Sequence, residues 1–165
     1  MTRRLVLTAV AACVLLLLPV AQASAYTTTL TLVGKRTVTL QRSQVPARVT
    51  WDGRLEGNIN PTLRYVYSGQ TLYKLVGKVD DSDPTTFNRA KARAGYKIRF
   101  ICRDGYRVSI SSRRIIDKKR WIIAKKKAGA LLPDGEAPYR FVGSFIEPFN
   151  GKLSARQIYK IRLIF

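Results

Sequence analysis

The sequence predicts an α+β protein: a single compact, mostly antiparallel β domain with short helices packed beside it. Three observations lead to this prediction. The chain has 165 residues, 46% of them hydrophobic, which suffices for one core and is too little for two ordinary domains. Beyond the N-terminal segment, apolar and polar residues alternate in short runs separated by turn residues, as in half-buried strands. Two further segments repeat their apolar residues at helical spacing.

Residues 1–25 have the layout of a secretory signal peptide, and the domain is expected over residues 26–165. Two arginines precede a long apolar run, and small residues then provide cleavage sites after Ala23 or Ala25. We therefore expect a protein that is secreted or lies in the cell envelope. A retained membrane anchor, a twin-arginine signal and a lipoprotein site at Cys13 are the alternatives.

The first half of the domain is expected to hold four short strands and two short helices. The predicted strands are Thr27–Leu32, Thr37–Leu40, Arg48–Trp51 and Thr62–Tyr67. Apolar spacing changes to the helical period over Thr71–Val79, and an aspartate-rich segment ending in Pro84 then stops the helix. A second helix is predicted over Thr85–Ala94, with Gly95 as its stop signal.

A hairpin over Tyr96–Ser111 can be placed in register from its apolar residues. A two-residue Asp-Gly loop would set Phe100 opposite Ser109 and mix the two faces. A three-residue loop instead sets Phe100 opposite Val108, unites one apolar face and puts Gly105 at the left-handed position. We predict the three-residue loop.

This register also fixes the direction of the side chains. It turns Cys102 toward the core, and Lys97, Arg99 and Arg107 toward solvent. Because cleavage removes the only other cysteine, no disulfide can form within the mature chain. Cys102 is expected to be buried and inert, and a disulfide between two chains is the alternative.

The remainder of the chain is expected to alternate between basic, turn-rich and strand-like segments. Ser112–Arg120 is predicted to be a basic connection or helical turn, and Leu132–Pro138 a turn-rich loop. The predicted strands are Trp121–Ala124, Tyr139–Val142 and Ile158–Phe165.

Five motifs follow one another in a characteristic order. They are an opening hairpin with the pattern L-x-L-x-G, then Tyr67–Leu75, Asp104–Tyr106, Ile123–Leu132 and Glu136–Val142. This series resembles the sulfite-oxidase-type molybdopterin-binding domain over nearly the whole mature chain. The resemblance implies a mostly antiparallel β fold with short helices. In catalytic members it also implies a molybdenum atom held by the pterin dithiolene and one protein cysteine.

The sequence departs from that family at the residues that carry its reaction. The stretch matching the cysteine-bearing segment is Val49–Arg54, and no cysteine occurs between Tyr26 and Ile101. The chain also has no histidine, which catalytic members use with arginine to hold the pterin phosphate. A soft thiolate completes the molybdenum coordination in this family, and the matching segment here lacks one, so we expect no cofactor. Molybdopterin is suggested only by the resemblance to the family.

We interpret the domain as an exported, non-catalytic binding or interaction module of this fold. A molybdopterin-dependent oxidoreductase with unusual ligation is one alternative, and a cationic binder of envelope polyanions is another. The absence of histidine removes the commonest general base, and two cysteines are too few for a zinc finger or ribbon.

A candidate ligand cleft is expected around Trp51, Asp104, Tyr106 and Arg140. Trp51 falls in the region that matches the cofactor segment and has the ring to stack on a ligand. Three of the four also have a structural explanation: core packing for Trp51, turn geometry for Asp104, and an ion pair with Glu136 for Arg140.

Three aspartates at positions 80, 81 and 83 are close enough to suggest a calcium loop. They lack the following glycine and the distal glutamate of such a loop, and a solvated helix break is the favoured interpretation.

The chain has 30 Lys and Arg against 10 Asp and Glu, a formal charge of +20. The candidate polyanion-binding residues are Arg113, Arg114, Lys118, Lys119, Arg120, Lys125, Lys126 and Lys127. Strand cations at 97, 99, 107, 160 and 162 are expected to extend the same field. The expected partners are anionic envelope polymers or lipid headgroups, with no specific nucleic acid. The alternative is that the charge only keeps the protein soluble.

Overall fold

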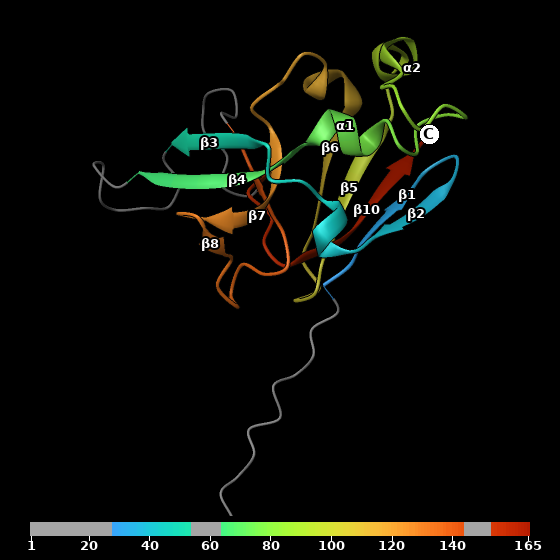
Figure 1. The fold of residues 1–165 in the computed structure, drawn as a ribbon. Helices are drawn as coiled ribbons and strands as arrows, with labels where there is room; N and C mark the ends of the chain where they lie inside the picture. Colours follow the sequence, from blue (N-terminus) through green and yellow to red (C-terminus); the bar gives the residue numbers. More distant parts are fainter. Residues whose placement is uncertain (1–27, 54–63, 144–152) are drawn as a thin grey trace, which may run out of the picture.

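A computed structural model describes residues 28–53, 64–143 and 153–165. Within these ranges the chain forms two β-sheets with short helices beside them, which confirms the predicted fold class (Figure 1). The predicted signal peptide and the start of the predicted strand Thr62–Tyr67 lie outside the described residues. No helix in the described ranges is long and apolar enough to cross a membrane.

The first sheet, called sheet A, has five strands in the order β2-β1-β10-β5-β6. Its strands are β1 (Leu30–Val33), β2 (Thr37–Leu40), β5 (Lys97–Cys102), β6 (Arg107–Ser111) and β10 (Ile158–Ile164). Strand β10 lies between β1, to which it is parallel, and β5, to which it is antiparallel. Strands from the two ends of the described chain therefore meet in the middle of one sheet (Figure 1).

The β5–β6 hairpin has the predicted register. Phe100 lies opposite Val108, and the Cys102 amide donates to the Tyr106 carbonyl oxygen at 3.0 Å. Gly105 has a φ of +84°, a conformation that glycine adopts without the steric penalty of a Cβ. Cys102 is buried, as predicted from the same register.

The second sheet, called sheet B, has five strands: four follow the order β3-β4-β7-β8, and the fifth, β9, pairs with β7. Its strands are β3 (Val49–Gly53), β4 (Tyr65–Thr71), β7 (Ile122–Lys127), β8 (Ala130–Leu131) and β9 (Arg140–Val142). Strand β7 is longer than predicted because its three lysines continue the pairing: Lys126 lies opposite Ser68, and Lys127 opposite Tyr67.

Both helices are shorter than predicted, and each has a local reason. Helix α1 (Leu72–Val76) begins after β4 has ended at Thr71, and it ends at Gly77, beyond which the Lys78 and Val79 amides donate to carbonyls three rather than four residues back. Helix α2 (Arg89–Ala94) starts four residues later than predicted, because the Asn88 side chain caps it by accepting from the Lys91 amide at 2.9 Å. Gly95 ends α2 as predicted, with a φ of +103°. Single 3-10 turns, η1 and η2, cover Arg42–Gln44 and Ser112–Ile115.

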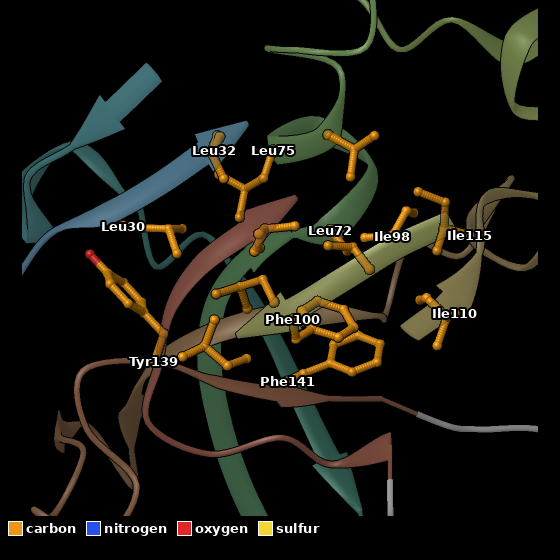
Figure 2. Packing of buried hydrophobic residues seen from close by; sticks show 14 of the residues in the cluster. Leu30, Leu32, Leu72, Leu75, Ile98, Phe100, Ile110, Ile115, Tyr139 and Phe141 are labelled. Carbon is orange, nitrogen blue, oxygen red and sulfur yellow. The ribbon is translucent and has the colours of Figure 1, made fainter. Parts of the chain in front are cut away.

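The core is divided between two clusters of buried side chains. The larger lies against sheet A and α1, where the Phe100 and Phe141 rings stack with centroids 4.7 Å apart (Figure 2). The smaller lies on the other side of sheet B and contains Trp51 and Tyr67. Strand β7 contributes to both clusters, so Trp121–Ala124 forms a continuous apolar run rather than an alternating one.

Candidate functional site

Four polar side chains of sheet B and its connecting loop meet below the surface. Glu136 accepts hydrogen bonds from Tyr67 Oη at 2.8 Å and Lys127 Nζ at 2.8 Å, and Arg140 Nη1 lies 3.0 Å from its carboxylate. Only 8% of Glu136 is exposed. We call Tyr67, Lys127, Glu136 and Arg140 the Glu136 cluster. The predicted Glu136–Arg140 ion pair is thus present, and it has two further partners.

The Glu136 cluster holds its groups in fixed protonation states. Burial alone would raise the pKa of Glu136, but the hydrogen bond from Lys127 and the positive charge of Arg140 outweigh it and lower the pKa. Burial raises the pKa of Tyr67, and the hydrogen bond to the carboxylate of Glu136 raises it further. Tyr67 therefore remains a neutral donor, and Glu136 remains an ionised acceptor.

The four residues of the candidate cleft do not line one cavity. Trp51 is 3% exposed, and its ring packs 6.1 Å from that of Tyr67, in the smaller core cluster. Asp104 accepts from the Tyr106 amide at 2.9 Å in the β5–β6 turn, which is the predicted turn geometry. Asp104 and Tyr106 line a hollow of about 210 Å³ that Trp51 does not reach. Arg140 lies behind this hollow and bonds Ser154, which lines it.

Cys102 is the only thiol among the described residues, and its surroundings keep it protonated. Burial, with the negative charge of Asp104 adding to it, raises the pKa of Cys102 to about 12. To bind a metal, Cys102 would have to lose its proton, and burial makes the resulting negative charge unfavourable. Nor do the described ranges contain a group of three or more Cys, Asp or Glu side chains placed to hold a metal ion.

The aspartates at positions 80, 81 and 83 form turns rather than a cation site. The expectation that this break is solvated is wrong for Asp80, which is fully buried and accepts from the Asn88 amide at 2.9 Å. Burial raises the pKa of Asp80. Asp83 is exposed and accepts from both the amide and the hydroxyl of Thr85. These contacts fix the entry to α2.

The eight cations from Arg113 to Lys127 lie before β7 and at its far end, and several are engaged in the fold. Arg113 donates to the Arg93 and Ala94 carbonyl oxygens at the end of α2, both at 2.8 Å. Lys125 donates to the Arg42 carbonyl, and Lys127 belongs to the Glu136 cluster. Lys118, Lys119 and Arg120 are exposed in the connection that precedes β7.

A second group of cations lies on the outward side of sheet A. We call Lys97, Arg99, Arg107, Lys160 and Arg162 the cationic face. They alternate along their strands with residues that are buried or partly buried, and the register of β10, β5 and β6 places all five on the side away from the core. The five strands of sheet A contain no aspartate or glutamate. Sequence analysis identified these cations, but the pairing of β10 with β5 is what places them together.

Comparison with known proteins supports the fold and leaves the activity open. No family model and no curated protein sequence matches the chain. Among solved structures, it is similar to the sulfane dehydrogenase SoxCD from Paracoccus pantotrophus, with a TM-score of 0.59 and 14% identity. The match covers 82% of this chain but 38% of that chain. This likeness supports a distant relationship in fold to sulfite-oxidase-like molybdopterin proteins.

Proposed function

We propose that this domain is an exported, non-catalytic module that binds anionic polymers. The observation that carries the proposal is the cationic face, where five positive side chains share one side of a sheet whose strands contain no acidic residue. None of the five forms an ion pair with another described residue. A polyanion that binds here gains affinity by releasing its condensed counterions.

The exposed cations of the β6–β7 connection add a second positive surface. Lys118, Lys119 and Arg120 have no acidic partner among the described residues, whereas the nearby Asp117 pairs with Arg89 at 2.7 Å. Together with a formal charge of +20, these side chains produce a field that attracts negatively charged polymers.

The chemistry of the available donors supports a non-catalytic role. In the family that the sequence resembles, molybdenum requires a protein thiolate. The stretch Val49–Arg54 supplies no cysteine, and Cys102 is buried with its pKa raised to about 12. These residues do not fit a molybdenum centre, so we derive no reaction step through one.

Salt-dependent retention on heparin tests the binding function. We expect the mature protein to stay bound above about 0.3 M NaCl, where weak nonspecific attraction is screened. A sulfopropyl exchanger serves as a control for net charge alone. Elution from heparin below about 0.15 M, or at the same salt as from the exchanger, would contradict the proposal.

Metal analysis tests the non-catalytic role separately. We expect protein exported by its natural host to contain far less than one molybdenum per chain. A stoichiometric molybdenum content would instead establish the oxidoreductase alternative.

A further inference from the structure

We propose that the cationic face binds a linear polymer of polyol phosphates, with successive phosphates held by Lys160, by the Arg162–Arg99 pair and by Lys97. This inference rests on the proposed function and specifies its ligand and its site. It is derived from the register of β10 and β5, the spacing of their cations and the residues around them.

The central observation is a pair of arginines in direct register. Arg99 on β5 and Arg162 on β10 are Cα partners on the outward side of adjacent strands. In such a pair the Cβ atoms are about 5 Å apart, and like charges directly opposite destabilise a sheet. No acidic residue of sheet A offsets this repulsion. A phosphate between the two guanidinium groups would relieve it, because each group can donate two parallel hydrogen bonds to the phosphate oxygens.

The remaining cations extend this site in both directions along the strands. Lys160 lies two residues from Arg162 on β10, and Lys97 lies two residues from Arg99 on β5. Because each two-residue step is about 6.8 Å, the line from Lys160 to Lys97 is about 14 Å long. An extended chain with an anion at roughly this interval would place three charges along the line. Arg107 on β6 lies opposite Ile101 of β5, so it adds a cation beside the Lys160 end of this line.

The other outward residues indicate what lies between the charges of the ligand. Hydroxyl side chains lie on both sides of the line, with Thr31 opposite Lys160 and Ser109 opposite Arg99. Apolar side chains alternate with them, since Ile101 is the other partner of Lys160 and Val33 lies opposite Arg162. Ser109 also accepts from Arg99 Nε at 3.3 Å, which orients the guanidinium group. Hydroxyls suit the polyol units of a phosphodiester chain, since they can both donate and accept hydrogen bonds.

Single-stranded nucleic acid fits this surface less well. Proteins that bind it stack successive bases on aromatic rings, and the paired outward positions of sheet A hold Thr, Val, Ser, Ile and the five cations. Two aromatics border this surface, Tyr159 at the β10 irregularity, with Lys160 over its ring at 5.6 Å, and Phe165 in the hollow that follows β10. They lie at opposite ends of β10, so they do not form the series of adjacent stacking surfaces that several bases require.

The line of cations ends in a hollow that offers room for a further unit of the polymer. This hollow has a volume of about 570 Å³ and is lined by Lys97, Ser109, Ser111, Arg113 and Phe165, among others. Lys97 and Ser109 belong to the outward rows of sheet A, so the hollow continues that surface. Arg113 adds a sixth cation at its far side.

The test measures binding of synthetic poly(glycerol phosphate) to the mature protein and its variants by calorimetry at several salt concentrations. In Arg99→Gln/Arg162→Gln, we expect affinity at about 50 mM salt to fall at least tenfold and the salt slope by about one to two. The matched control Arg48→Gln/Lys74→Gln removes two exposed charges that lie outside both positive surfaces. We expect the control to lose less than about threefold.

A second variant separates the proposed arginine clamp from net charge. Arg99→Lys/Arg162→Lys keeps both charges but loses the bidentate geometry. We expect the wild-type salt slope with an affinity about three- to tenfold lower. Equal affinity to wild type would overturn the clamp. Urea unfolding of each variant verifies that the fold is retained.

Three competing ligands distinguish failure of this inference from failure of the proposed function. Heparin, oligo-dT and anionic phospholipid vesicles are compared with poly(glycerol phosphate) at equal charge. Tighter binding of any of the three, or a larger loss of affinity in Lys118→Gln/Lys119→Gln than in Arg99→Gln/Arg162→Gln, overturns this inference and leaves a polyanion-binding function standing. No binding to any of the four overturns both.

Discussion

Glu136 is the residue on which the polar interior of sheet B depends. Its carboxylate bonds one residue each on β4 and β7 and lies 3.0 Å from Arg140 of β9. The pair Glu136–Arg140 could be expected from its spacing of four residues. Tyr67 and Lys127 are distant in sequence, and no local pattern indicates that they converge on the same carboxylate.

Replacing Glu136 with Gln should strongly destabilise the protein. The substitution leaves Arg140, whose side chain is 12% exposed, without its counter-charge. Breaking a buried pair in this way costs about 3 kcal/mol of unfolding free energy. Urea unfolding at neutral pH measures the difference, with Tyr67→Phe as a milder comparison that should cost about 1 kcal/mol. A Glu136→Gln protein as stable as wild type would show that the cluster is dispensable.

The stabilising effect of Glu136 should also depend on pH, and Glu136→Gln can be used to measure this dependence. The pKa of Glu136 is lower in the fold than its ordinary value of 4.5, so its stabilising effect is present above that value. It is lost as the pH falls below 4.5 through the lowered pKa of the folded state. The stability difference between wild type and Glu136→Gln should therefore be nearly constant above about pH 5 and shrink as the pH falls from 4.5 to about 3. An unchanged difference would contradict the assigned ionisation.

Cys102 should be nearly unreactive in the folded protein. With its pKa raised from 9.0 to about 12, the thiolate fraction at about pH 8 falls roughly a thousandfold, and burial also blocks access. Modification by a disulfide reagent, followed by absorbance on the mature chain, should be slow until denaturant is added. Rapid reaction under native conditions would place the thiol at the surface.

At the level of elements, the hairpin and the helices show what local sequence determines. The β5–β6 register was predictable because alternate residues must face one core, and a shift of one residue would bury serines. Helix lengths were not, because Asn88 caps α2 inside the predicted span and β4 runs up to the start of α1. Strand β7 also extends into a lysine run that resembles a solvated segment in sequence.

Gly105 should be required for the β5–β6 turn. At a φ of +84°, a Cβ would cost about 1–2 kcal/mol, so Gly105→Ala should lower the unfolding free energy by about that amount. Gly135→Ala is the matched control, because Gly135 is exposed and a Cβ there would meet no atom within 4 Å. Thermal unfolding compares the two variants. Equal losses of stability in the two variants would show that the positive φ at position 105 does not require glycine.

The Arg99–Arg162 pair should make sheet A less stable than it could be. Arg162→Gln removes a like-charge pair between neighbouring strands, and we expect it to raise the unfolding free energy by about 0.2–1 kcal/mol at low salt. The gain should fade at about 0.5 M salt because of screening. Lys118→Gln, outside the sheet, serves as the control. A loss of stability in Arg162→Gln would show that the pair is not repulsive.

For the whole molecule, the candidate site depends on topology that sequence patterns do not specify. Strand β10 pairs with both β1 and β5, although these strands are separated by more than 60 residues, and this arrangement brings the five cations together. Composition revealed the positive charge, and alternation revealed which strand cations face outward. Neither could show that the cations of β10 lie beside those of β5, or that Trp51 lies in sheet B whereas Asp104 lies in the β5–β6 turn of sheet A.

The most direct test of the cationic face is a titration of isotope-labelled mature protein with poly(glycerol phosphate), followed by amide chemical shifts. We predict that the largest changes occur at Lys97, Arg99, Lys160 and Arg162, and that sheet B changes little. Changes centred on the Lys118–Arg120 connection, or no saturable change anywhere, would contradict the account.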